Sequence, residues 1–377
     1  MMYWLHHLSV GASSEFLKAL NVFQYISFRA VAAAVTAFLL SLVFGNRVIR
    51  QLISLKIGQP IRSKEEVHRL SELHGKKAGT PTMGGVLILG TVLVSTVLWA
   101  RLDNHAVWLL VFTLVACGLL GFWDDYLKVS KRNAAGISER TKLLGQGAVA
   151  VVVAAFFLLN PALEVQARAL YAPFAKEPLL ANLGWFTVVF FALVIMGSSN
   201  AVNLTDGLDG LAAGCTVTTG VAYAVLTYVA GNMKIAQYLQ IPYYPFAGEL
   251  SVVCMALVGA AFGFLWFNCY PARVFMGDTG SLAIGGFFGV VAICCKQELL
   301  LVVVGGVFVI EALSVLIQRT YFKVTRRIYG EGRRVFLMSP IHHHFELKGW
   351  KENTVIVRFW IVSVMFCLLG LATLKLR

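Results

Sequence analysis

The chain has 377 residues, of which 58% are hydrophobic and only 14% are charged, and its net charge is +13. A soluble domain usually carries about 25% charged residues, so this composition argues against a water-soluble enzyme. The apolar runs are continuous rather than alternating, which argues against a closed strand barrel. We therefore expect an all-α polytopic bundle in lipid. We assign the basic excess to loops that face anionic headgroups, and not to nucleic acid.

A helix needs roughly 20 apolar residues to cross a bilayer. Ten candidate runs occur, at 22–44, 82–100, 106–123, 143–160, 183–199, 211–230, 249–268, 282–295, 299–318 and 354–374. One set of connections holds 22 of the 32 Lys and Arg residues, namely 45–81, 124–142, 200–210, 269–281 and 319–353. By the positive-inside rule we expect these active-site loops to be cytoplasmic and both termini, with the N-terminal segment 1–21, to be periplasmic. The whole chain, 1–377, is then one transmembrane catalytic domain.

Two pairs of small residues lie inside apolar runs, Gly259–Gly263 and Gly285–Gly289. GxxxG spacing lets two helix backbones approach closely in lipid. In a chain with 34 glycines, coincidence explains either pair equally well.

The first polar motif, Asp124-Asp125-Tyr-Leu-Lys128, directly follows the third apolar run. Adjacent carboxylates repel each other unless a cation neutralises them, and Lys128 is within reach on a helix face. A divalent metal would complete such a site, because Mg²⁺ binds carboxylate oxygens and substrate phosphates. A solvated pair with a local salt bridge is the alternative.

The second motif, Asn203-Leu-Thr-Asp206-Gly-Leu-Asp209-Gly, is embedded in apolar sequence. On a helix, Asn203, Asp206 and Asp209 would share one broad face. Polar groups at membrane depth are costly and usually face a cavity or a partner. A helix-capping turn is the alternative.

The third motif runs from Asn268 to Ser281 and contains Gly277-Asp278-Thr-Gly. Glycines beside Asp278 let the backbone approach a ligand closely. We expect a helix from about Ser281, and the amides at its N-terminus would favour phosphate. A turn followed by a helix cap is the alternative.

The fourth motif is the consecutive triplet His342, His343 and His344 in a basic loop. Imidazoles bind phosphate when charged and relay protons near neutral pH. The triplet lacks zinc spacing such as HExxH. An exposed histidine run without function is the alternative.

The fifth motif, 76–85, places Lys77 and Thr82 beside a Gly/Thr turn at the start of the second run. Lys77 and the lysine directly before it suit the binding of a diphosphate. A basic flank that only sets topology is equally consistent with the pattern.

All five motifs lie on one predicted face of the membrane, and together they predict a site for a metal-bridged phosphate. Walker A, GxGxxG and GxSxG patterns are absent from the sequence. Their absence argues against ATP-driven transport, a Rossmann cofactor and serine hydrolysis.

The acidic motifs resemble, in order, those of the polyprenyl-phosphate N-acetylhexosamine-1-phosphate transferase superfamily. Asp124-Asp125, Asn203 to Asp209 and Asp278 carry this resemblance. The triple-His loop and the segments 76–85 and 275–282 are similar to those of its bacterial phospho-N-acetylmuramoyl-pentapeptide transferase family. The resemblance covers essentially the whole chain, and that family has ten transmembrane helices.

The resemblance implies an enzyme of the bacterial inner membrane that joins UDP-N-acetylmuramoyl-pentapeptide to undecaprenyl phosphate. The products would be lipid I and UMP, in the first membrane step of peptidoglycan synthesis. It also implies a requirement for Mg²⁺, a homodimer, and inhibition by nucleoside antibiotics.

The same resemblance suggests roles for individual residues. Asp278 and Asp124 would hold the metal, and the catalytic set would be Asp124, Asp125, Asp278 and His343. Substrate would be bound by Lys77, Thr82, Lys128, Lys142, Asn203, Asp206, Asp209, Asn268, Gly277, Ser281, Gln318, His342 and His344.

Two rival functions come from different classes. One is a sister enzyme that transfers N-acetylglucosamine-1-phosphate, against which the His-rich loop argues. The other is a cation-coupled secondary transporter. Transporters keep carboxylates near the bilayer midplane, whereas the acids here are expected at loop ends on one side.

Overall fold

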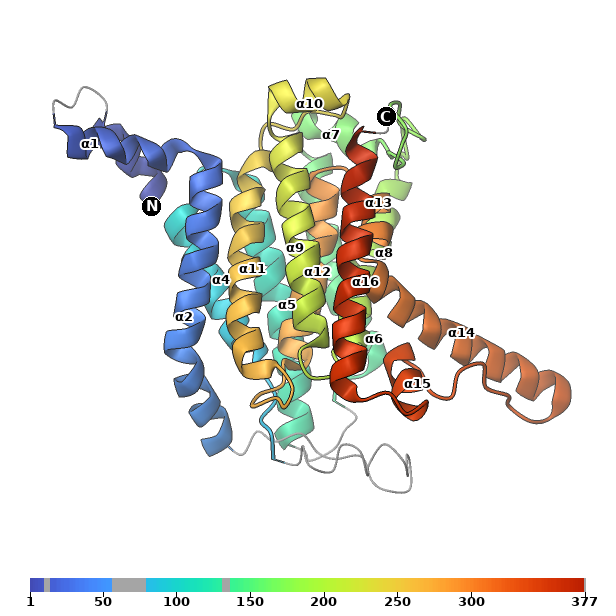
Figure 1. Cartoon of the computed structure of the whole chain (residues 1–377). Helices are drawn as coiled ribbons and strands as arrows, with labels where there is room; N and C mark the ends of the chain where they lie inside the picture. The colour runs from blue at the N-terminus through green and yellow to red at the C-terminus, as the bar shows by residue number, and fades with distance from the viewer. Residues whose placement is uncertain (10–13, 56–78, 131–135, 376–377) are drawn as a thin grey trace.

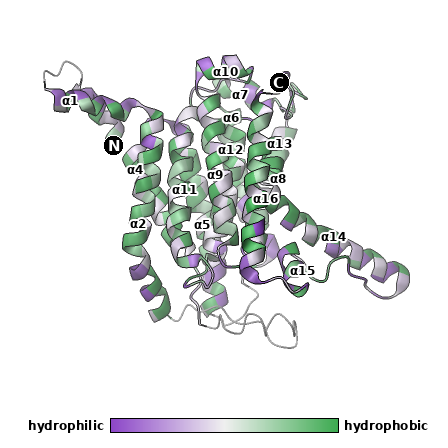
Figure 2. Ribbon diagram, viewed as in Figure 1, coloured by the Kyte–Doolittle hydropathy of each residue, from purple (hydrophilic) through white to green (hydrophobic). Residues whose placement is uncertain are grey.

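A computed structural model describes residues 1–9, 14–55, 79–130 and 136–375 (Figure 1). Within these residues the chain is helical, and an isolated β-bridge joins Leu170 to Leu180. Apolar residues cover the long helices (Figure 2). The expectation of an all-helical polytopic membrane protein is therefore confirmed.

Eight helices in the described residues are long and apolar enough to cross a membrane. They are α2 (Ile26–Ser54), α5 (His105–Ser130), α6 (Glu139–Leu158), α8 (Phe186–Thr205), α9 (Leu211–Ala230), α11 (Ala247–Asn268), α12 (Gly277–Cys294) and α16 (Glu352–Ala372). A ninth candidate is the bent pair α13 (Glu298–Val304) and α14 (Gly306–Tyr329), while α4 (Gly85–Trp99) has only 15 residues. Each predicted run thus coincides with helix, but the count of ten spans stays a prediction.

The sequence predicted one continuous span at 299–318. The structure instead divides this run between two helices. Helices α13 and α14 meet at an angle of 87° around Gly305, and α14 leaves the bundle sideways (Figure 1). Paired glycines are a common cause of sharp helix bends. Gly306 also packs against the Phe366 ring, where an added Cβ would come within 2.7 Å.

Shorter elements cap the two ends of the bundle. At the end that carries both termini lie η1 (Met2–Ser9), α1 (Glu15–Ala19), η2 (Leu20–Gln24), α7 (Pro161–Arg168), α10 (Met233–Leu239) and η4 (Thr373–Lys375) (Figure 1). At the opposite end lie α15 (Ile341–Leu347) and the connection between α11 and α12. The two termini share one end, while the sidedness of the bundle in a membrane stays a prediction.

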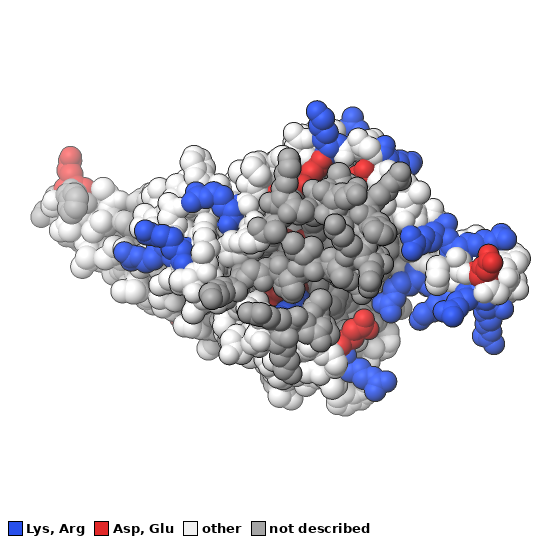
Figure 3. All heavy atoms as spheres, turned by 90° about the horizontal axis from the view of Figure 1, so that it is seen from below, with Lys and Arg blue, Asp and Glu red and all other residues white. Residues whose placement is uncertain are grey.

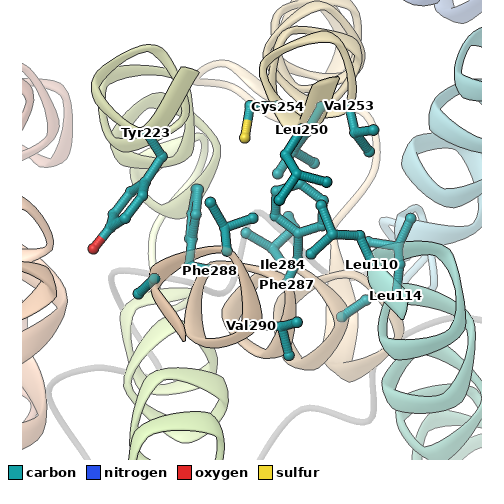
Figure 4. Close-up of a cluster of buried hydrophobic side chains, with 14 of the residues drawn as sticks. Leu110, Leu114, Tyr223, Leu250, Val253, Cys254, Ile284, Phe287, Phe288 and Val290 are labelled. Carbon is teal, nitrogen blue, oxygen red and sulfur yellow. The ribbon is translucent and has the colours of Figure 1, made fainter. Parts of the chain in front are cut away.

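Helix α12 forms the centre of the bundle, and nearly all its side chains are buried. Phe287 and Phe288 lie between α5, α9 and α11, as Figure 4 shows, and belong to one buried cluster with Leu110, Leu114, Tyr223, Leu250 and Val253. Tight apolar packing of this kind holds α12 rigidly, so the residues at its N-terminus have a fixed support.

Both GxxxG pairs lie at helix–helix contacts. A Cβ on Gly259 would fall 1.9 Å from the Ala34 carbonyl oxygen of α2, and one on Gly285 would fall 2.4 Å from the Ser198 oxygen of α8. Any side chain at these points would force the helices apart. The close-packing interpretation is therefore the right one for both pairs.

A buried ion pair joins α2 to α11 near the end that carries the termini. The Arg29 guanidinium donates hydrogen bonds from both terminal nitrogens to Glu249, with Nη2 2.9 Å from Oε2. Both side chains are almost fully buried. Glu249 also accepts the backbone N–H of Arg101 at 2.8 Å. This one carboxylate therefore connects three segments of the bundle.

We predict that Glu249→Ala lowers the free energy of unfolding by about 3 kcal/mol or more, because it leaves the Arg29 guanidinium buried without an anion. Thermal unfolding of purified protein in detergent measures this loss. Asp103→Ala is the matched control, because the Arg101–Asp103 pair is 42% exposed on both sides and should contribute less than about 1 kcal/mol. Equal losses in the two variants would contradict the prediction.

Candidate active site

Three carboxylates converge where the end of α5 meets the N-terminus of α12. Asp124 and Asp125 come from α5 and Asp278 from α12, and each offers one oxygen within 4.8 Å of the others. Asp124 and Asp125 are buried, and the Asp278 side chain is 14% exposed. The predicted convergence of the first and third motifs is therefore present in the fold.

Glycine contacts bring the two helices together at this point. A Cβ on Gly121 of α5 would lie 2.1 Å from the Asp278 carbonyl oxygen, so only glycine allows this approach. Helix α12 begins at Gly277 with φ +74°, four residues before the predicted start. Asp278 is therefore in the first helical turn and not in a loop.

The segment at 81–85 is hydrogen-bonded to the irregular stretch that precedes α12. Phe275 N donates to Pro81 O at 2.8 Å, and Gly84 N donates to Phe275 O at 2.8 Å. Thr82 is buried next to Gly277, whose added Cβ would lie 2.9 Å from the threonine hydroxyl. The fifth motif therefore meets the third, although Lys77 lies outside the described residues.

Asp125 supports the start of α12. Its Oδ2 accepts the Thr279 N–H at 2.9 Å and the Thr279 hydroxyl at 2.7 Å, and its Oδ1 accepts the Asp278 N–H at 3.2 Å. These amides belong to the first turn of a helix, where backbone donors lack intrahelical partners. Both carboxylate oxygens of Asp125 thus accept hydrogen bonds that hold Asp278 in place.

Two lysines neutralise the other two carboxylates. Lys128 Nζ lies 2.6 Å from Asp124 and 3.1 Å from Asp278, and Lys142 Nζ lies 2.7 Å from Asp278 and 3.4 Å from Asp124. Lys128 makes the contact to Asp124 from one turn further along α5, as its spacing predicted. Lys142 comes from the first turn of α6, so three helices contribute to this charge cluster.

Asn203 joins the second motif to the third. Its side-chain nitrogen donates to Asp278 Oδ1 at 2.8 Å and to the Ser281 hydroxyl at 2.9 Å. The predicted shared helix face is wrong, however, because α8 ends at Thr205. Asp206 and Asp209 lie in the turn that follows, where glycines at 207 and 210 break the helix.

Asp206 and Asp209 hold the backbone around the site. Asp206 accepts the Gly277 N–H at 3.1 Å, and Asp209 accepts the Ala272 N–H at 2.9 Å. Burial, together with the neighbouring carboxylates of Asp278 and Asp125, raises the pKa of Asp206 to about 8.

The histidines of the triplet occupy three different environments. His342 is fully buried, with Nδ1 3.1 Å from Glu311 of α14 and its ring against Gly207. His343 contacts Glu346 at 2.7 Å. His344 Nδ1 accepts the Leu337 N–H at 3.1 Å. Partial burial, with Lys348 nearby, lowers the pKa of His344.

Gln318 and Asn268 also make local contacts. The Gln318 amide binds the backbone of Val335 and Phe336 at 3.0 to 3.1 Å, which fastens the loop after α14. Asn268 donates to Val274 O at 2.8 Å and closes the connection into α12. In this structure both side chains stabilise loops at their own positions in the chain.

Several contacts come from residues that no sequence pattern singled out. Ile137 donates its N–H to Asp124 Oδ1 at 2.7 Å, and Glu352 accepts the Asp209 N–H at 3.2 Å. Thr279 was visible only as part of the Gly-Asp-Thr-Gly turn. A backbone donor such as Ile137 leaves no signal in its side chain, so only the fold shows it.

The donor set suits Mg²⁺. Hard carboxylate oxygens are its preferred protein ligands, usually one or two with substrate phosphates completing the shell. Asp124 Oδ2 and Asp278 Oδ2 already bind two ammonium groups between them. The negative charge of the site is therefore concentrated between these two oxygens. The residues present therefore fit a divalent cation held by Asp124 and Asp278.

Comparison with known proteins agrees with this geometry. Residues 107–296 match the family model for glycosyl transferase family 4, and residues 77–89 match phospho-N-acetylmuramoyl-pentapeptide-transferase signature 1. A phospho-N-acetylmuramoyl-pentapeptide-transferase of Methylacidiphilum infernorum (isolate V4) is 53% identical over 377 residues, covering 100% of both chains. A protein of the same name from Desulfotalea psychrophila is 52% identical over 95% of this chain and 96% of the relative. Another from Maridesulfovibrio salexigens is 48% identical over 99% of this chain and 100% of the relative. The chain therefore belongs to the phospho-N-acetylmuramoyl-pentapeptide-transferase family.

Proposed function

We propose that this enzyme transfers phospho-N-acetylmuramoyl-pentapeptide from its UDP-linked precursor to undecaprenyl phosphate, giving lipid I and UMP. The observation that carries the proposal is the cluster of Asp124, Asp125 and Asp278 with Lys128 and Lys142 at one end of an apolar bundle. Such a cluster suits the transfer of a phosphoryl group, which needs positioning and charge neutralisation more than covalent chemistry.

In the reaction, an oxygen of the lipid phosphate forms a bond to the β-phosphorus of the UDP-sugar, and the bond from that phosphorus to the oxygen of UMP breaks. Lys128 and Lys142 are 28% and 17% exposed, so their ammonium groups can reach phosphate oxygens. Asn203 and Ser281 fix the orientation of Asp278. A two-step path through a carboxylate nucleophile is an alternative that inversion or retention at phosphorus would distinguish.

Mg²⁺, when bound, would withdraw charge from the diphosphate oxygens and so make UMP a better leaving group. Asp278 and Asp124 are the residues that would hold it. Asp124 would also position the lipid phosphate, and Asp125 keeps the first turn of α12 in register through its contacts to Thr279. His343 and Lys77 stay candidates for phosphate contact.

The position of the site gives both substrates access. The acidic cluster lies where helix ends meet polar loops, whereas the polyprenyl chain of the acceptor belongs in hydrocarbon. We place the enzyme in the bacterial inner membrane with this end towards the cytoplasm, where the sugar nucleotide is made. Lys and Arg side chains gather on this face, most densely near the free end of α14 (Figure 3). A homodimer and inhibition by nucleoside antibiotics remain predictions from the family resemblance.

Release of UMP by the purified protein tests the proposal. We expect release from UDP-N-acetylmuramoyl-pentapeptide only when undecaprenyl phosphate and Mg²⁺ are both present. With UDP-N-acetylglucosamine as donor, release should fall by about a hundredfold or more, since unmatched polar groups in a specific pocket are heavily penalised. Preference for UDP-N-acetylglucosamine would support the sister activity, and ion uptake without UMP release would support a transporter.

A further inference from the structure

Lys128 and Lys142 share the same two acceptor atoms. Both ammonium groups contact Asp124 Oδ2, at 2.6 and 3.4 Å, and both contact Asp278 Oδ2, at 3.1 and 2.7 Å. Lys128 reaches these oxygens from α5 and Lys142 from α6. Two cations therefore already lie between the two carboxylates that are best placed to hold a metal.

The remaining oxygens of these carboxylates are also in use. Asp124 Oδ1 accepts the Ile137 N–H at 2.7 Å, and Asp278 Oδ1 accepts the Asn203 side-chain N–H at 2.8 Å. A carboxylate oxygen has about two acceptor positions, and on each Oδ2 two ammonium bonds fill them. A metal ion that binds either Oδ2 must therefore displace an ammonium group.

We propose that Lys128 and Lys142 are built-in counter-ions that hold the metal ligands together in the absence of the ion. When the donor binds, their ammonium groups move to its phosphate oxygens. The identity of that donor rests on the proposed function, whereas the exchange of ammonium for metal rests only on the contacts above.

The exchange has a physical consequence for binding. Asp124 and Asp278 would repel each other without a cation between them, so the lysines stabilise the metal-free fold. Once the ion replaces them, the displaced ammonium groups are left beside a dication and need new anions. The diphosphate supplies them, and both lysine side chains are partly exposed. The ion should bind weakly alone and more tightly with the diphosphate, and by linkage each ligand should strengthen the other.

Binding of Mn²⁺ to the full-length protein without nucleotide, followed by electron paramagnetic resonance, tests the exchange. Lys128→Met and Lys142→Met should each raise the affinity for Mn²⁺ by about tenfold, because one competing charge is removed at contact distance. Arg140→Met is the matched control, since Arg140 is exposed in the first turn of α6, two residues from Lys142. It should change the affinity by less than about twofold, because its charge is screened by solvent.

A second measurement examines the coupling. Saturating Mg²⁺ should strengthen the binding of UDP-N-acetylmuramoyl-pentapeptide to the wild-type protein, and this gain should shrink in both lysine variants. Unchanged or weaker Mn²⁺ binding in both variants, or an equal gain in Arg140→Met, would overturn the proposal. If neither lysine variant folds, lack of any coupling in the wild-type protein would overturn it. Failure of UMP release with these metal effects intact would instead contradict the proposed function.

Discussion

Asp278→Asn should lower the rate of UMP release by about a thousandfold while the protein stays folded. The substitution keeps the size of the side chain and removes the charge that faces Lys128 and Lys142. The fold should survive, because Asp125 still accepts the amides of the first turn of α12. Initial rates with both substrates and Mg²⁺ measure the loss, and the unfolding temperature in detergent checks the fold.

Two further variants sharpen this test. Asp103→Asn removes a carboxylate that is 42% exposed and lies outside the site, so it should keep its full rate. Asp278→Glu keeps the charge but moves it by one methylene, and we expect it to recover only part of the activity. If Asp278→Asn retained more than about a tenth of the wild-type rate, Asp278 would not have the metal-binding role assigned to it.

Gly121→Ala should also impair the enzyme strongly, although residue 121 carries no functional group. The added Cβ would lie 2.1 Å from the Asp278 carbonyl oxygen and 2.6 Å from the Thr279 nitrogen, and both are backbone atoms that cannot rotate away. The first turn of α12 must therefore move, which displaces the Asp278 carboxylate. A shift of this kind can lower the rate by about a hundredfold.

The control for Gly121→Ala is Gly147→Ala in α6, where no heavy atom lies within 4 Å of the added Cβ. That variant should keep its activity, and its stability should rise slightly, because alanine favours helix more than glycine does. Gly121→Ala should also lose about 1 to 3 kcal/mol of stability through overpacking. Wild-type rates in Gly121→Ala would contradict the close helix contact on which the site geometry depends.

Much of the architecture could be predicted from hydropathy alone. Every predicted apolar run coincides with helix, because about 20 consecutive apolar residues have few other stable forms in lipid. The bend at Gly305 could not be predicted in this way, since Gly305 and Gly306 do not interrupt the apolar run. Helix ends were also missed. The polar residues at the ends of α5 and α14 continue the helices beyond the apolar part, so Asp124 and Lys128 lie on helix and not in a loop.

The acidic cluster could be predicted in outline but not in detail. The convergence of Asp124 with Asp278 followed from their placement on one predicted face. The different roles of Asp124 and Asp125 could not be predicted, because the two residues are neighbours in sequence. Only the fold shows that Asp125 contacts Thr279 and that Asp124 contacts the lysines. The burial of His342 against Glu311 was equally hidden, since a run of three histidines has the same pattern whether it is exposed or packed.

The most direct test of the account is an experimental structure of the protein with Mg²⁺ and UDP-N-acetylmuramoyl-pentapeptide bound. We expect the ion on the carboxylate of Asp278, bridging to the diphosphate, with Lys128 and Lys142 turned towards phosphate oxygens. A diphosphate bound at the end of the bundle that carries the termini, or an ion that touches neither Asp278 nor Asp124, would contradict the account.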